Sequence, residues 1–96
     1  MLIIAGKFYV APEHRDDCVA SYVDFVRRTR ATPGCLDLII AADPVEPGRV
    51  NNFERWESNE QLREFQAMAD PPQPVTEVLT DDVALYEISA TGPVFP

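Results

Sequence analysis

The sequence predicts a single domain of the α+β class, and three observations predict it. Four short apolar segments have the length and composition of β-strands. Two longer segments carry apolar residues at the three- and four-residue spacing of amphipathic helices. Clusters of proline, glycine and aspartate separate these segments. The chain has 96 residues, of which 46% are apolar, so we expect one folded domain over residues 1–96.

The first predicted strand is Leu2 to Val10, which is apolar on both of its alternating sides. Pro12 then begins a helix, because a missing backbone N–H costs nothing in the first helical turn. The stripe of this helix comprises Val19, Tyr22, Val23 and Val26, widened by Cys18 and Phe25. Arginines near its end suit the helix dipole, and Pro33-Gly34 ends it.

A hairpin follows the first helix. Cys35 to Ala42 is predicted as the second strand, with Leu36, Leu38 and Ile40 sharing one side. Residues 43–48 are rich in turn formers, and Arg49 to Glu57 is the third strand. The short connection predicts that these two strands pair antiparallel.

The second predicted helix begins at Ser58, which forms a capping box with Gln61. Its apolar stripe comprises Leu62, Phe65 and Ala69. Prolines at 71–74 end it, and residues 75–80 could add one further helical turn. Residues 83–90 form the last predicted strand, and residues 91–96 form a tail whose apolar side chains are available to dock on a neighbour.

The resulting order is β-α-β-β-α-β, the ferredoxin-like pattern of a four-stranded antiparallel sheet with helices on one face. Two helices cover only one face, yet three of the strands are apolar on both faces. A large bare apolar face is unusual for a monomer, so we expect a homodimer with a second copy covering it. The alternative is that short side chains such as Ala41 and Ala84 tolerate water.

The formal net charge of −8 argues against nucleic acid and anionic membranes as partners. No apolar run approaches the length of a membrane span. Cys18 and Cys35 form no CxxC pair, and the first ten residues lack the features of a secretory signal. We therefore expect reduced thiols and a cytoplasmic protein.

The most informative motif lies on the third strand, where Asn52, Glu54 and Trp56 share one side. Tryptophan offers a flat apolar wall and an N–H donor, and asparagine offers both a donor and an acceptor. Such a set could hold a flat, oxygenated aromatic ligand. The alternative is that Trp56 belongs to the core and that Glu54 pairs with a nearby arginine.

With its motifs at residues 33–36, 43–44 and 54–58, the chain resembles the antibiotic biosynthesis monooxygenase family. The resemblance implies a dimeric α+β barrel. Some members oxidise quinols or polycyclic aromatic phenols with O₂ and use no flavin, haem or metal cofactor. In those enzymes an asparagine and a tryptophan four residues apart contribute to the active site, and Asn52 and Trp56 match that spacing.

The chemistry that this resemblance implies needs no cofactor, because an electron-rich phenolate can itself reduce O₂. The protein must bind the phenolate, favour its ionised form and exclude water. We expect Asn52 and the Trp56 N–H to donate hydrogen bonds to the developing oxyanion as the catalytic residues. The expected substrate-binding residues are Glu54, Arg55, Phe65, Tyr22 and Tyr86.

The roles of three of these residues are conditional. Arg55 starts on the other side of its strand, so it reaches the substrate only if the strand twists. Tyr22 and Tyr86 have the alternative role of core aromatics.

The chain also departs from the family at its histidines. Phe65 stands where many members have a histidine, nine residues after the tryptophan, and residues 70–74 lack a second one. The related haem-degrading enzymes need an axial histidine in that helix and an asparagine on the first strand, which this chain lacks. The only histidine, His14, is expected at the surface and makes no metal site. A non-catalytic, dimeric small-molecule binding module of the same fold is therefore the alternative function, and a cyclase or isomerase a third.

Overall fold

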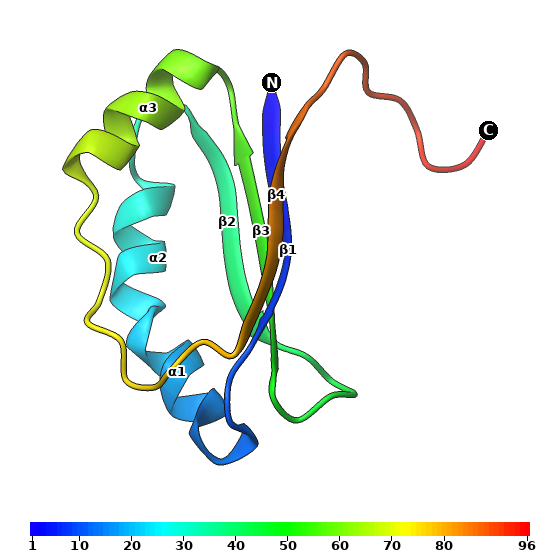
Figure 1. The fold of residues 1–96 in the computed structure, drawn as a ribbon. Helices are drawn as coiled ribbons and strands as arrows, with labels where there is room; N and C mark the ends of the chain where they lie inside the picture. Colours follow the sequence, from blue (N-terminus) through cyan, green and yellow to red (C-terminus); the bar gives the residue numbers. More distant parts are fainter.

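The structure, a computed structural model, describes residues 1–96 and holds four strands, three α-helices and one 3₁₀ turn (Figure 1). The elements in chain order are β1 (Leu2–Tyr9), η1 (Pro12–His14), α1 (Arg15–Ser21), α2 (Val23–Arg30), β2 (Cys35–Ala42), β3 (Arg49–Trp56), α3 (Asn59–Met68) and β4 (Thr80–Glu87). None of the helices has the length and apolar character that crossing a membrane requires.

The four strands form one antiparallel sheet in the order β2-β3-β1-β4, which confirms the predicted ferredoxin-like architecture. All the helices lie on the same side of the sheet (Figure 1). Helices α1 and α2 pack mainly on β2, and α3 packs on β3. The helices therefore cover the β2–β3 half of one face, and the opposite face has no covering element within the chain.

Strand pairing assigns each side chain to the helix side or to the open side of the sheet. On the helix side, Trp56 lies between Leu2 and Cys35 in the register. The irregularity between Cys35 and Asp37 makes Leu36 an extra residue in β2. The expectation that Leu36 shares the environment of Leu38 is therefore wrong, since Leu36 is 41% exposed and Leu38 only 1%.

The best-buried core is a small cluster at one end of the sheet. Trp56 and Leu62 are completely buried there and pack with Leu2. Ile4, Cys35 and Phe65 are partly buried against this cluster. Because α3 contributes Leu62 and Phe65, this cluster joins the second helix of the ferredoxin-like unit to the two central strands.

The first predicted helix is divided at Tyr22, which separates α1 from α2. The Tyr22 N–H bonds to the carbonyl of Val19, three residues back, which is the tighter 3₁₀ spacing. Ser21 Oγ also donates to the carbonyl of Cys18 at 2.6 Å, a side-chain bond that competes with regular helix geometry. The predicted start at Pro12 holds, although its first turn is the 3₁₀ segment η1.

Helix α3 begins as predicted. Ser58 Oγ accepts the Gln61 backbone N–H at 3.2 Å, and the hydroxyl donates to Gln61 Oε1 at 3.1 Å. The extra helical turn expected at residues 75–80 is wrong, because that stretch is irregular up to Leu79 and Thr80 already belongs to β4. The Leu79 N–H bonds to the carbonyl of Tyr9 at 2.8 Å, which draws the chain into the sheet early. Strand β4 consequently starts three residues before the predicted position and ends at Glu87.

A polar network holds the β2–β3 hairpin against α1. Arg15 Nη1 lies 3.2–3.3 Å from the carbonyl oxygens of Asp43, Glu46 and Arg49. Hydrogen bonds from the Glu46 backbone N–H and the Asn51 amide hold the pKa of Asp43 at about 2, below its usual 3.8. The hairpin therefore has a defined position beside the start of α1.

We expect Gly6→Ala to destabilise the fold, because Gly6 has a φ of +153° and an added Cβ would lie 2.0 Å from the carbonyl oxygen of Asp82. The free energy of unfolding should fall by about 1–3 kcal/mol in urea titrations, because the β1–β4 pair must shift apart. Gly92→Ala is the control, since a Cβ there meets nothing within 4 Å. Equal stabilities of the two variants would contradict the close approach of β1 and β4.

Candidate functional site

The structure places Asn52, Glu54 and Trp56 on the helix side of β3, as predicted from their spacing. Trp56 is completely buried, whereas Asn52 and Glu54 are half-buried. The Trp56 indole N–H donates to Glu54 Oε1 at 3.1 Å. Glu54 therefore has a tryptophan partner rather than the arginine considered from the sequence, and the indole N–H is engaged within the chain.

Aromatic rings connect Trp56 to the helices. The Trp56 and Phe65 ring centroids lie 5.0 Å apart, and the Phe65 ring lies 6.0 Å from Phe25. Phe25 in turn meets Tyr22 edge-on at 6.2 Å. These separations fall in the range of favourable aromatic contacts. Phe65, at the position of the family histidine, thus connects Trp56 to Phe25 in this series.

The Asn52 amide makes no hydrogen bond within the chain, although its side chain is half-buried. Its cross-strand neighbours on the helix side are Ile40 and Gly6. Neither neighbour has a polar side chain, and Gly6 has no side chain at all. The amide therefore keeps both its donor and its acceptor available to a ligand on the helix side of the sheet.

The other predicted residues are divided between the two sides of the sheet. Tyr86 is paired with Ile3 and is 53% exposed, and Arg55 is exposed on the same open side. The sheet separates both from Asn52 and Trp56, so one chain does not bring all the predicted residues into one pocket. Tyr22 and Phe65 do lie on the helix side.

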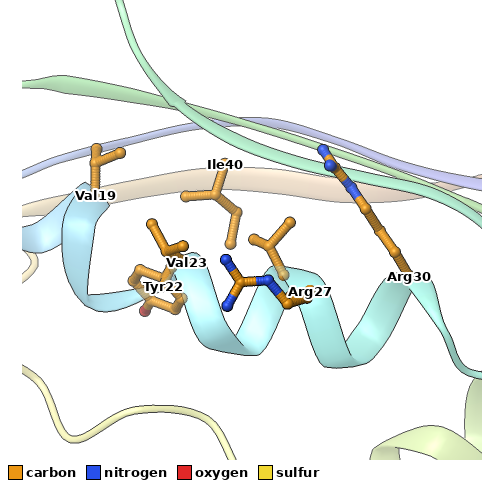
Figure 2. Close-up of a pocket in the computed structure, with 7 residues that line it drawn as sticks. Val19, Tyr22, Val23, Arg27, Arg30 and Ile40 are labelled. Atoms are coloured by element: carbon orange, nitrogen blue, oxygen red, sulfur yellow. The ribbon is translucent and has the colours of Figure 1, made fainter.

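Three cavities open between the helices and their surroundings, and neither Asn52 nor Trp56 lines any of them. The first, of about 330 Å³, lies between α1–α2 and β2 (Figure 2). Its lining comprises Val19, Tyr22, Val23, Val26, Arg27, Arg30 and Ile40. The second, also of about 330 Å³, lies beside Phe65 at the end of α2, and the third, of about 300 Å³, lies under residues 70–73.

Sequence reasoning identified the apolar stripe of the first cavity but missed its arginines. Arg27 and Arg30 have the spacing that suits a helix dipole, and no signal in the sequence indicates that they flank a groove. Ile40 was identified only as a strand residue. The folding of α2 onto the edge strand β2 brings these three residues together.

Burial raises the pKa of the Cys18 thiol and of the Cys35 thiol, the latter also under the influence of nearby Glu54. Protonated thiols are poor nucleophiles, so neither cysteine suits covalent catalysis. Burial likewise raises the pKa of Tyr22. His14 is exposed, and no three His, Cys, Asp or Glu side chains come together as metal ligands.

The architecture and the helix-side row of β3 define a ferredoxin-like α+β domain with a half-buried polar site on its third strand. The family model for antibiotic biosynthesis monooxygenases matches residues 1–70. The chain therefore belongs to the antibiotic biosynthesis monooxygenase family. A comparison with curated proteins found no match.

Solved structures support this fold over the full chain. A Deinococcus radiodurans protein given the same family description aligns with a TM-score of 0.79 at 19% identity, covering 100% of both chains. A Bacillus cereus protein given that description aligns with a TM-score of 0.68 at 19% identity, covering 100% of this chain and 98% of its own. A haem-degrader from Mycobacterium tuberculosis, with two haems bound in its active site, aligns with a TM-score of 0.70 at 11% identity. The alignment covers 97% of this chain and 100% of that protein.

The residues of this chain do not fit the haem of that last neighbour. Helix α3 contains no His, Cys or Tyr that could serve as an axial ligand, and Phe65 packs on Trp56 instead. His14 lies in the exposed turn η1, before α1.

We expect Trp56→Phe to lower the free energy of unfolding by about 1–3 kcal/mol, because it removes the N–H donor to Glu54 and leaves space in the core. Urea titration would measure the loss. Phe95→Leu is the control, because Phe95 is 82% exposed in the tail. A Trp56→Phe protein as stable as the wild type would show that this bond and this packing do not stabilise the fold in solution.

Proposed function

We propose that this protein is a cofactor-independent monooxygenase that oxidises a small aromatic, quinol or polyketide-like phenol with O₂. The observation that carries the proposal is the Asn52 amide, which is half-buried on the helix side of β3 and makes no hydrogen bond within the chain. Membership of the antibiotic biosynthesis monooxygenase family supports the reaction class. The two neighbouring polar and aromatic residues, Glu54 and Trp56, support the choice of a phenolic substrate.

In this proposal Asn52 donates a hydrogen bond to the phenolate oxygen and so favours the ionised substrate. Glu54, the carboxylate next along the same side of β3, accepts the phenol proton. Trp56 acts through Glu54 as a positioning residue, because its N–H holds Glu54 Oε1. Phe65 and Phe25 provide apolar aromatic surface for a flat substrate.

The proposed reaction balances without an external reductant. With an anthrone, the ionised ring system gives up electrons to O₂, and a ring CH₂ carbon becomes a carbonyl. One oxygen atom enters that carbonyl and the other leaves as water, carrying the two hydrogens lost from the carbon. The task of the protein is to stabilise the anion and to exclude bulk water while the radical pair recombines.

The proposal is tested by O₂ uptake with a panel of hydroquinones and anthrones. We expect Asn52→Ala to lower kcat by about 100-fold, the usual effect of removing one oxyanion donor. Asn59→Ala is the matched control and should keep wild-type turnover, because Asn59 is an exposed residue at the start of α3. Glu54→Gln should also lower kcat, because it removes the proposed proton acceptor. Turnover that survives Asn52→Ala unchanged would overturn the assignment.

A non-catalytic binding module is the second candidate, and Phe65 favours it. In place of a histidine base, Phe65 presents an apolar ring to Trp56 and Phe25. Tight binding of aromatic ligands with no O₂ uptake from any of them would establish this function. Product formation without O₂ uptake would instead indicate the cyclase or isomerase considered from the sequence.

We also propose that the open side of the sheet is covered by a second copy. One complete cross-strand row on that side is apolar, comprising Ile39, Phe53, Ala5 and Ala84. Tyr86 and Ile3 extend this apolar area by one row. Contiguous apolar surface of this kind is commonly an interface, and a face-to-face pair would bury it isologously.

Two further expectations remain proposals. The free state of Cys18 and Cys35 is what a reducing compartment such as the cytoplasm maintains. The net charge of −8 leaves a small molecule, rather than nucleic acid or an anionic membrane, as the favoured partner.

We expect Ile39→Asp to convert the dimer to a monomer at micromolar concentration, because it places a charge in the apolar row, at its β2 end. Light scattering after size exclusion would measure the mass. Val45→Asp introduces the same charge at an exposed hairpin position and should leave the mass unchanged. A wild-type protein that is monomeric in this assay would refute the proposed interface without affecting the assignment to the family.

A further inference from the structure

We propose that the groove between α1–α2 and β2 binds a small apolar carboxylate, with the carboxylate on Arg27 and the apolar body against Ile40. The groove adjoins the proposed oxygenase site through Ile40, the cross-strand neighbour of Asn52, but neither Asn52 nor Trp56 lines it. The inference does not rest on the proposed reaction. It follows from an apolar floor, two flanking guanidinium groups and the distribution of charge partners along α2.

The groove offers mostly apolar surface to a ligand. Five of its seven lining residues are hydrophobic, and Figure 2 shows Ile40 of β2 facing Val23 and Tyr22 of the helical layer across it. Val23 is 52% exposed, so the chain itself does not cover this side of the groove. Its volume of about 330 Å³ lies in the range of small-molecule sites.

The charge partners of the arginines single out Arg27. Arg28 bonds to Asp24 Oδ2 at 2.9 Å and to the carbonyl of Asp70 at 3.0 Å. Arg30 Nε donates to the carbonyl of Leu38 at 2.8 Å and lies 3.6 Å from Asp37 Oδ1. Arg27, by contrast, has neither a hydrogen bond nor an ion pair from its side chain.

The Arg27 side chain points toward the groove and not toward an acidic residue. Figure 2 shows its guanidinium folded back along α2 toward Val23 and Tyr22, over the apolar part of the groove. A helix dipole explains a cation near the end of α2, but it does not require the head group to lie beside apolar side chains. In a chain with a net charge of −8, an unpaired cation at this place is complementary to an anionic ligand.

A free guanidinium beside an apolar groove favours one class of ligand, an apolar carboxylate. A guanidinium binds a carboxylate through two parallel hydrogen bonds, and Arg27 is free to make them, whereas Arg30 already has Leu38 and Asp37 as partners. The apolar floor favours an aromatic or short acyl body, and the Tyr22 ring provides a flat contact. Phosphorylated ligands fit less well, because a dianion needs more unpaired cations than the groove provides.

The probe is 2-naphthoate, with 2-naphthamide as its uncharged analogue of the same shape. We expect naphthoate to bind the whole protein at least about tenfold more tightly than naphthamide in calorimetry, since the carboxylate adds charge-assisted bonds. Backbone amide shifts in two-dimensional NMR should change at residues 19–30 and at Ile40. Raising the salt concentration should weaken the binding of naphthoate and leave the binding of naphthamide unchanged.

Arg27→Gln should lower the affinity for naphthoate by about tenfold and leave the affinity for naphthamide unchanged. The matched control is Arg63→Gln, an exposed arginine on α3 outside the groove, which should alter neither affinity. Val23→Ser should lower the affinity for both ligands, because it removes apolar contact area. A thermal melt of each variant confirms that it is folded.

Equal affinity for the two ligands, or naphthoate binding that survives Arg27→Gln, would overturn the proposal. Shift changes at Asn52, Glu54 and Phe65 without any at residues 19–30 would overturn the proposal and assign the ligand to the β3 site instead. Binding that emerges only when residues 91–96 are deleted would overturn the proposal for the whole protein, because it would show that the tail fills the groove in solution. The O₂-uptake result is independent of all these outcomes, so either proposal can fail alone.

Discussion

The burial of Trp56 is the interaction on which the site depends. Its ring packs with Leu2 and Leu62, which joins β3 to β1 and to α3. Its N–H at the same time holds the Glu54 carboxylate at 3.1 Å. One side chain thus sets both the position of the second helix and the orientation of the carboxylate beside Asn52. This double role explains why apolar packing and a polar site coexist on one strand.

The second constraint is that the helices cover only part of the sheet. They pack on β2 and β3, so the chain by itself completely covers neither face. A domain of 96 residues buries a modest fraction of its surface, and only nine residues here are buried. The uncovered apolar area is the surface that the proposed second copy would cover on the open side and the proposed ligand would cover on the helix side.

The elements that pack around α2 determine which of its three arginines have hydrogen-bond or charge partners. Arg28 is engaged by Asp24 and by the segment after α3, and Arg30 by the edge of β2. Arg27 lies between them, over the groove, and has no such neighbour (Figure 2). Three arginines that are equivalent as helix-dipole partners therefore differ in what they can bind, and the difference arises from elements distant in the sequence.

The sequence by itself determined the ferredoxin-like order, the hairpin, the Ser58 cap and the shared side of Asn52, Glu54 and Trp56, because these depend on local periodicity and turn chemistry. It misplaced β4, since the Leu79–Tyr9 bond that starts this strand is a long-range contact. Alternation along the third strand also placed Arg55 on the side away from Trp56. Only the tertiary structure decided that Tyr86 lies on that side too, and that the Trp56 N–H donates to Glu54. The groove was equally invisible in the sequence, because its walls come from α2 and β2 and form only when these two elements pack.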